Sequence, residues 1–344
     1  MTRWSPPVGA ATGVGSMPGT ELAESLAVVV DVVGELPYLP ELPERGPGSD
    51  LVGRGAALLA DLHTDLQPSG WRLVGRPGHD ERRARSRLAQ DLDLLEERTQ
   101  RWTGPLKVQA AGPWTLAAAL WTERGGQVLA DRGACRDLVA SLAEGVSQHL
   151  ADIARRVPEA QLVLQLDEPS LPTVLAGAVP TPSGLGRVAS VEWAVARAGL
   201  SAVLGAAATA GAVQVVHCCA AEAPLDLFAE AGAEAASLDL SLLGADAEER
   251  LGSWVESRRV LMAGVVRAVG PSGDGDLSDA GATVGPVRGW WHRLGQPAER
   301  LAAQVVLTPA CGLAGASPAR AKAVLAHLVR AGRVLVDDPE GGRG

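Results

Sequence analysis

A histidine and two cysteines stand where apolar segments of the sequence end, and their side chains suit metal binding. His217 and Cys219 follow an apolar run and are two residues apart, so on an extended strand both side chains point to the same side. Cys311 follows another apolar segment near the end of the chain. Imidazole nitrogen and thiolate sulfur are ligands that Zn²⁺ prefers. These residues predict a zinc site, with Asp239, which ends an intervening segment, as a possible fourth ligand.

The competing interpretation of the cysteines is that they only pack in the core. A free cysteine is among the most buried residue types and behaves as a small hydrophobe. This interpretation is the better one for a single cysteine, and we expect Cys135 and Cys218 to be packing residues. Three potential ligands at the ends of strands favour a metal site instead.

Two further segments could hold the charged groups of a small substrate. Asp167 and Glu168 end an apolar run, where paired acids suit an ammonium group or general-base chemistry. A helix cap or a salt bridge is the alternative role for these acids. The turn at Gly15 and Ser16 offers backbone N–H groups and a hydroxyl, which suit a carboxylate, although it can equally be a plain tight turn.

Short apolar segments alternate with longer helical stretches along the whole chain, and this pattern must position those side chains. Residues 81–101 and 136–156 have the apolar spacing of helices. The eight expected strands are residues 12–16, 36–39, 107–111, 162–166, 213–218, 235–240, 260–266 and 305–308. Continuously apolar strands are typical of a parallel sheet covered on both faces. The pattern predicts an α/β fold, a single (β/α)8 TIM barrel over residues 1–344 with a short N-terminal extension.

The alternative fold is a doubly wound open sheet. Such a sheet would usually have a glycine-rich phosphate turn after its first strand, and the nearest candidate, residues 13–19, contains an unsuitable Pro18. We expect residues 270–287, which are rich in Gly, Asp and Ser, to form a mobile loop at the C-terminal face of the barrel. Residues 337–344 are expected to be a disordered tail.

The composition excludes several classes of protein. Lys and Arg number 31 against 40 Asp and Glu, a net charge of −9, which argues against a nucleic-acid partner or an anionic membrane surface. Four cysteines are too few for a disulfide scaffold of this length. The N-terminus has no apolar core of signal-peptide length, and no apolar stretch is long enough to span a bilayer. We therefore expect a cytoplasmic protein.

Taken together, these segments resemble the C-terminal catalytic domain of cobalamin-independent methionine synthase, within the barrel superfamily that includes uroporphyrinogen decarboxylase. Order and spacing agree over nearly the whole chain, and the His-x-Cys followed by a late Cys-Gly-Leu is the most specific part. The matching segments are residues 14–18, 112–115, 165–169, 217–219 and 309–313.

The resemblance implies that His217, Cys219 and Cys311 bind Zn²⁺ as the cofactor. The remaining zinc ligand of the family is a Glu, and Asp239, one methylene shorter, falls at its position.

The resemblance also implies which residues hold homocysteine. Gly15 and Ser16 would bind its carboxylate, and Asp167 would bind its amino group within the catalytic machinery. A family Glu that contacts the substrate falls at Glu41 or Glu44, of which we favour Glu41.

Two differences from the family concern the methyl donor. Full-length members have a second, N-terminal barrel that helps to bind a polyglutamylated folate, and 344 residues leave no room for one. Members also have a His at the end of the seventh strand, proposed to protonate the departing folate, whereas residues 264–269 contain none. Both differences weaken the case for methyltetrahydrofolate and leave open a methyl-corrinoid or a corrinoid protein as donor.

The expected function is zinc-dependent methyl transfer to the thiol of homocysteine, which forms methionine. Within enzymes, the alternatives are a methyltransferase for another thiol and a superfamily decarboxylase without a metal. An alternative of another class is a non-catalytic barrel that binds zinc or thiols.

Overall fold

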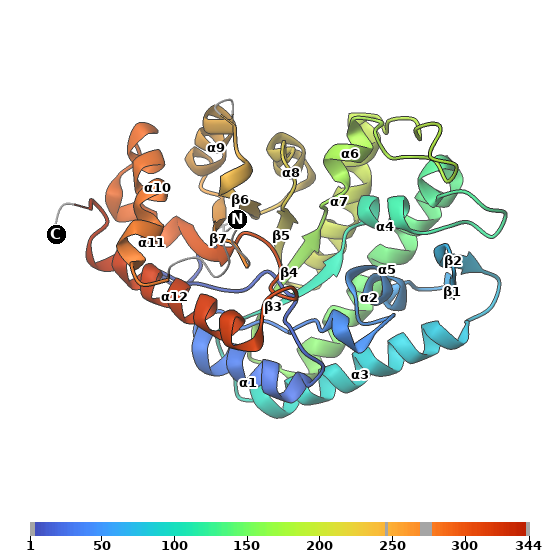
Figure 1. Cartoon of the computed structure of the whole chain (residues 1–344), viewed down its shortest axis with the longest axis horizontal. Coiled ribbons are helices and arrows are strands. Elements are labelled where there is room, and N and C mark those ends of the chain that lie inside the picture. Colours follow the sequence, from blue (N-terminus) through green and yellow to red (C-terminus); the bar gives the residue numbers. More distant parts are fainter. Residues whose placement is uncertain (1–3, 245–246, 269–276, 342–344) are drawn as a thin grey trace.

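The computed structural model describes the whole chain except residues 1–3, 245–246, 269–276 and 342–344. Its centre is a parallel sheet in which six strands follow one another in sequence order. They are β3 (Pro105–Ala111), β4 (Gln161–Asp167), β5 (Val213–Cys218), β6 (Ala235–Asp239), β7 (Val260–Val266) and β8 (Val305–Pro309). All six were predicted, with bounds that differ by at most two residues. Figure 1 shows these strands at the centre of the molecule with helices around them.

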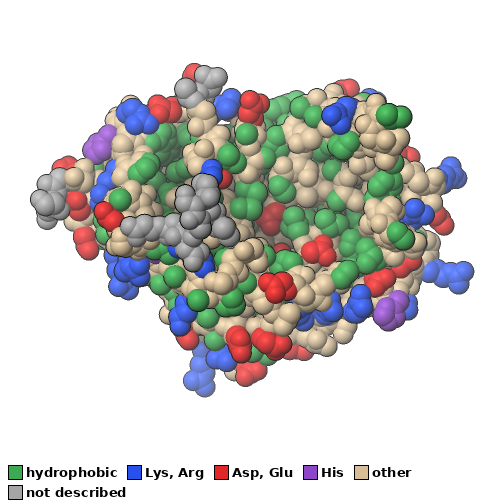
Figure 2. All heavy atoms as spheres, viewed as in Figure 1, with side chains coloured by type: hydrophobic (Ala, Val, Ile, Leu, Met, Phe, Trp, Pro, Cys, Tyr) green, Lys and Arg blue, Asp and Glu red, His purple; other side chains and the backbone are tan. Residues whose placement is uncertain are grey.

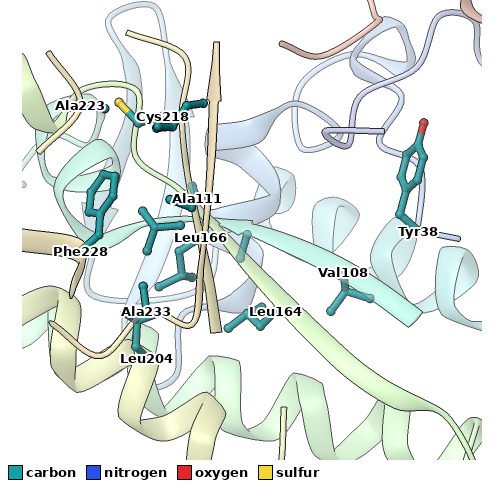
Figure 3. Packing of buried hydrophobic residues seen from close by; sticks show 14 of the residues in the cluster. Tyr38, Val108, Ala111, Leu164, Leu166, Leu204, Cys218, Ala223, Phe228 and Ala233 are labelled. Atoms are coloured by element: carbon teal, nitrogen blue, oxygen red, sulfur yellow. The ribbon is translucent and has the colours of Figure 1, made fainter. Parts of the chain in front are cut away.

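Both faces of the sheet are buried, which explains why its strands read as nearly continuous apolar runs. On the outer face, side chains such as Val108, Leu164 and Leu166 pack against the surrounding helices, as in Figure 3. On the inner face, a separate apolar cluster includes Val163 and Met262. An apolar layer therefore covers each face of the sheet. The polar side chains of the inner face lie at other positions along the same strands.

The two remaining expected strands are not regular strands of this sheet. Residues 12–16 and 36–39 lie beside the edges of the sheet, but only isolated bridges join them to it and to each other. These bridges pair Ala11 with Leu307, Ser16 with Glu41, and Tyr38 with Lys107. Proline lacks the N–H that a ladder needs, and residues 36–43 contain three prolines. The described residues thus form a six-stranded sheet, and the prediction of eight regular strands was wrong for these two segments.

The helices alternate with the strands, as predicted. Residues 81–99 and 136–156 are confirmed as helical, in α3 (His79–Thr99) and α5 (Arg132–Arg156), whereas residues 100–101 of the first prediction lie beyond the end of α3. The helix α5 begins earlier than predicted because Asp131 caps it by accepting from Gly133 N and Ala134 N. The described helices are α1 (Leu22–Val33), α2 (Leu51–Leu58), α3 (His79–Thr99), α4 (Pro113–Ala119), α5 (Arg132–Arg156), α6 (Leu171–Leu175), α7 (Trp193–Thr209), α8 (Leu225–Ala231), α9 (Ala247–Glu256), α10 (Ala280–Arg293), α11 (Leu301–Gln304) and α12 (Pro318–Asp337). None of them is long and apolar enough to cross a membrane.

Three further features differ from the expectations. An antiparallel hairpin, β1 (His63–Gln67) with β2 (Gly70–Val74), was not predicted. The prediction of a loop at residues 270–287 was wrong for residues 280–287, which belong to α10. Asp279 caps the start of this helix, because its Oδ1 accepts from Ala282 N at 2.9 Å. The first part of that loop, and residues 342–344 of the expected tail, lie outside the described residues, while Asp337 still belongs to α12.

Candidate metal centre

Three of the predicted zinc ligands lie together at the carboxyl ends of β5 and β8. His217 is the penultimate residue of β5, Cys219 follows that strand directly, and Cys311 follows β8. Their potential ligand atoms all lie within 4.8 Å of one another. The Cys219 and Cys311 sulfurs are 3.1 Å apart, and His217 is buried while Cys311 is exposed. The arrangement combines buried support with access from solvent.

Ser237 holds the ring of His217. The two residues are in register on β6 and β5, and Nδ1 of His217 lies 2.9 Å from Oγ of Ser237. Nε2 of the same ring is buried and has no hydrogen-bond partner among the residues described. A buried polar atom without a partner is costly, and a metal ion would satisfy it. Sequence reasoning missed Ser237, although its place two residues before Asp239 on the inner side of β6 was a usable signal.

The donor set fits zinc. One known class of catalytic zinc site has one imidazole nitrogen and two cysteine sulfurs as its three protein ligands and keeps the fourth position open. The hydrogen bond from Cys219 and the neighbouring His217 ring lower the pKa of Cys311 to about 4, and the same sulfur–sulfur contact raises the pKa of Cys219. These opposite shifts favour the thiolate at Cys311 over one at Cys219.

Asp239 does not belong to this group in the described part of the chain. Its Oδ1 accepts hydrogen bonds from Ser241 N at 2.9 Å and from Ser241 Oγ at 2.6 Å, and it caps the short 3-10 helix Leu240–Leu242. A short side chain that bonds to its own backbone two residues later is a common local turn. The predicted fourth ligand is thus engaged locally rather than with the three others.

Asp167 lies beside the three-residue group, on the neighbouring strand. It is the last residue of β4, in register with His217 on β5, and it is 7% exposed. Its Oδ1 accepts from Nε2 of Gln165 at 2.7 Å. Burial raises the pKa of Asp167 to about 7, although the charge of His217 acts in the opposite direction.

Glu168, the second predicted acid, has a structural role. Its carboxylate accepts from Trp114 N at 2.9 Å, and from Thr115 N and Thr115 Oγ1, both at 2.8 Å. It therefore caps the first turn of α4 from the neighbouring strand. A Cβ on Gly112 would lie 2.4 Å from Cδ of Glu168, so a glycine is needed there. The two acids do not act as a pair, and a helix cap, weighed as an alternative, is the role of Glu168.

The Gly-Ser turn lies next to the loop that carries Cys311. Ser16 O accepts from Leu313 N at 2.8 Å, and a Cβ on Gly312 would lie 2.0 Å from Ser16 Oγ. Neither the amide nor the hydroxyl of Ser16 donates a hydrogen bond to another described residue. Gly15 packs closely on the side chain of Gln109, since a Cβ there would meet it at 3.0 Å.

Of the two glutamates left open by the sequence, only Glu41 lies in the interior. It is 4% exposed, and its Oε1 lies 3.4 Å from Arg54 Nε and 3.2 Å from Gln109 Nε2, whereas Glu44 is exposed. Burial raises the pKa of Glu41 and Arg54 opposes this rise. Figure 2 shows acidic side chains near the centre of the face it presents, among hydrophobic ones, with Lys and Arg mostly round the edge.

Sequence reasoning also missed a buried cation in the middle of β3. Lys107 is fully buried, donates to Val14 O at 2.8 Å and lies over the ring of Tyr38. Burial lowers its pKa to about 8, while the carboxylates Asp167 and Glu41 act in the opposite direction. The signal was available, because Lys107 is one of only two lysines in the chain and lies within a strand whose other residues, apart from Gln109, are apolar.

Comparison with known proteins shows the fold. No protein-family model and no curated protein matches the chain. Its structure is similar to that of a B12-independent methionine synthase from Shewanella sp. W3-18-1 in complex with selenomethionine, with 12% identity, 96% of this chain and 99% of that chain covered, and a TM-score of 0.58. Two other solved structures align too poorly to carry an argument. One is an oxaloacetate acetylhydrolase with 11% identity, 86% of this chain and 75% of that chain covered, and a TM-score of 0.36. The other is a 2,3-dimethylmalate lyase with 12% identity, 87% of this chain and 74% of that chain covered, and a TM-score of 0.35. At this identity the likeness to the methionine synthase shows a TIM-barrel-like fold and nothing finer.

Proposed function

We propose that this protein is a zinc-dependent methyltransferase that transfers a methyl group to the thiol of homocysteine and forms methionine. The observation that carries the proposal is the cluster of His217 with the sulfurs of Cys219 and Cys311, whose ligand atoms lie within 4.8 Å of one another, in register with the buried carboxylate of Asp167. A metal-ligand group and a carboxylate on adjacent strands suit a substrate that has both a thiol and an ammonium group. We also propose that residues 12–16 and 36–39 take the places of the first two strands of a (β/α)8 barrel.

His217, Cys219 and Cys311 would hold the zinc. Bound zinc would remove the proton of a coordinating thiol and leave a nucleophilic sulfur at neutral pH. With Nδ1–H of His217 donating to Ser237 Oγ, the ring would be held in the orientation and tautomer in which Nε2 is the ligand atom. Asp239 lies outside the cluster, where its Oδ1 accepts two hydrogen bonds from Ser241, so we assign the fourth position to the substrate sulfur.

The charged groups around the cluster support an amino-acid substrate. Asp167 forms no salt bridge with any described side chain, and its Oδ2 accepts no hydrogen bond from one, whereas Glu41 is paired with Arg54. Among the described residues Asp167 therefore has no cation in salt-bridge contact, since Lys107 and His217 act on it only through longer-range electrostatics, and the ammonium of homocysteine would supply that contact. The amide and hydroxyl of Ser16, which donate to no other described residue, would donate hydrogen bonds to the substrate carboxylate.

The methyl transfer is an in-line displacement, for which orientation contributes most of what the protein can supply. A lone pair of the substrate sulfur forms the new S–C bond, and the bond from the methyl group to its donor breaks with both electrons left on the donor. A folate nitrogen would need a proton at this step. The residue at the end of β7 is Arg267, whose guanidinium is not deprotonated in proteins and donates to Ser241 Oγ at 2.9 Å. We therefore favour a methyl-corrinoid, free or on a corrinoid protein, whose departing cobalt(I) needs no proton.

The test is a methyl-transfer assay with homocysteine in which methyltetrahydrofolate and methylcobalamin are offered in parallel to zinc-loaded protein. We expect methionine with methylcobalamin, its loss in Cys311→Ser, and its retention in Cys135→Ser, whose sulfur lies away from the cluster and bonds to Val128 O. Turnover with the folate alone would overturn the choice of donor. No turnover with either donor would favour another thiol or a non-catalytic barrel.

A further inference from the structure

One buried amide links the two ends of the proposed amino-acid site. Gln165 is 1% exposed and lies on β4, two residues before Asp167 and on the same side of the sheet. Its Nε2 donates to Val14 O at 2.8 Å and to Asp167 Oδ1 at 2.7 Å. Because a side-chain amide has two N–H hydrogens, both are used, one toward each end of the site.

The carbonyl of Val14 is held from two sides. It accepts from Gln165 Nε2 and also from Lys107 Nζ, each at 2.8 Å, so both of its lone pairs are engaged. Ser16 lies two residues further on, and its own amide and hydroxyl have no partner among the described residues. The turn is thus anchored through Val14, while the donors of Ser16 are not engaged by any residue that the structure describes.

We propose that Gln165 is a positioning residue that fixes the spacing between Asp167 and the Ser16 turn and so makes the site specific for α-amino acids. This inference rests on the proposed function. An α-amino acid has its ammonium and carboxylate on one carbon, so it can bind both ends at once only if their separation is fixed. A thiol that lacks these groups makes no use of the link.

The test compares binding and turnover in Gln165→Met, which keeps the side-chain length but has no donor. Gln304→Met is the matched control, because Gln304 is also buried and donates to two backbone carbonyls, Val255 O and Arg259 O, but from α11. Gln165→Asn is a second variant, whose amide is one methylene too short to reach both partners. Unfolding midpoints of all four proteins establish that each is folded.

The first readout is calorimetric titration of the metal-free proteins with methionine, which has both charged groups and needs no metal or methyl donor. We expect wild type and Gln304→Met to bind alike, and both Gln165 variants to bind about 10- to 100-fold more weakly, because the two ends of the site would no longer be held at the spacing that the ligand needs. Equal binding by wild type and the Gln165 variants would overturn the role of Gln165 and leave the proposed function standing. No binding by wild type would overturn the amino-acid site itself, and this inference with it.

The second readout is the ratio of kcat/KM for homocysteine to kcat/KM for 1-propanethiol, with methylcobalamin as donor. A positioning role predicts that Gln165→Met lowers this ratio about 100-fold while the value for 1-propanethiol stays within about 3-fold of wild type. A merely structural role would lower both values together and leave the ratio unchanged, which would contradict the proposal.

Discussion

Asp167 and His217 lie opposite each other in the same register, at the carboxyl ends of the neighbouring strands β4 and β5. Because their side chains share the inner side of the sheet, a group held at His217 and a group held at Asp167 are one strand spacing apart, about 5 Å. This relationship places the proposed thiol and ammonium sites on a rigid sheet rather than on loops. It also makes separate predictions possible for the metal ligands and for the carboxylate.

Replacement of a cysteine of the cluster should abolish zinc binding. Cys219→Ser and Cys311→Ser each remove a thiolate ligand, and we expect less than about 0.3 zinc per chain after dialysis, against about one for wild type. Metal analysis of the purified proteins checks this. Cys218→Ala is the matched control, because Cys218 is buried in the outer apolar layer and should leave the zinc content unchanged. Equal zinc in all four proteins would exclude this cluster as the site.

Removal of the Ser237 hydroxyl should weaken zinc binding without abolishing it. Loss of the hydrogen bond to His217 Nδ1 frees the ring to turn, and such partners are typically worth about 10- to 100-fold in metal affinity. A competition titration with a chromophoric chelator measures the change in Ser237→Ala. Thr308→Val serves as its control, because it deletes another buried hydroxyl that has no partner among the described residues. An unchanged affinity in Ser237→Ala would show that the ring is held by packing alone.

The stability of the metal-free protein should depend on pH through Asp167. Burial raises its pKa to about 7 in the folded state, above about 3.9 in the unfolded chain. Between those values only the folded state keeps the proton, so the contribution of Asp167 to stability is lost as pH rises toward 7. Asn at position 167 never ionises. The free energy of unfolding of Asp167→Asn should therefore rise relative to that of wild type as the pH is raised from 4 to 8.

Urea unfolding of wild type and Asp167→Asn at several pH values measures this difference in free energy of unfolding. Titrating groups far from Asp167 are shared by the two proteins and cancel in the comparison, whereas His217, Glu41 and Lys107 interact with Asp167 and contribute to the measured difference. Parallel pH profiles would mean that Asp167 is ionised throughout this range in the folded protein.

Glu168 should matter for stability and not for zinc. Glu168→Ala leaves two backbone N–H groups of α4 and the Thr115 hydroxyl without their acceptor, at a cost of about 3 kcal/mol in the free energy of unfolding. Urea unfolding at pH 8, together with zinc analysis, checks both statements. Glu44→Ala, at an exposed position, should change neither. A large loss of zinc in Glu168→Ala would assign this residue to the metal centre instead.

The sequence was informative about the sheet because burial on both faces leaves a continuous apolar signature. Each of the six regular strands has that signature, whereas β1 and β2 form a half-exposed hairpin of mixed residues such as His63, Asp65 and Arg72. Residues 12–16 and 36–39, at the edges of the sheet, are as apolar as strands, but they contain glycine or proline and form only single bridges. Backbone hydrogen bonding, which composition does not report, separates the two cases.

For the site, residues at strand ends could be predicted and their supporting contacts could not. His217, Cys219 and Cys311 share the end of a parallel sheet, and that position follows from the order of the elements. The partners Ser237 and Gln165 are polar residues inside strands, whose roles depend on register between strands far apart in the sequence. The separation of Asp167 from Glu168 likewise depends on where the first turn of α4 lies.

The contact between Ser16 and the loop after β8 has a consequence for the timing of biosynthesis. The backbone bond from Leu313 to Ser16, and the close packing of Gly312 on its hydroxyl, join the start of the chain to a segment made some three hundred residues later. At ordinary rates of translation the first segment waits about 15 to 60 s for these partners. Cys311 emerges at the same late moment, so the nascent chain cannot assemble the complete cluster until this residue has left the ribosome.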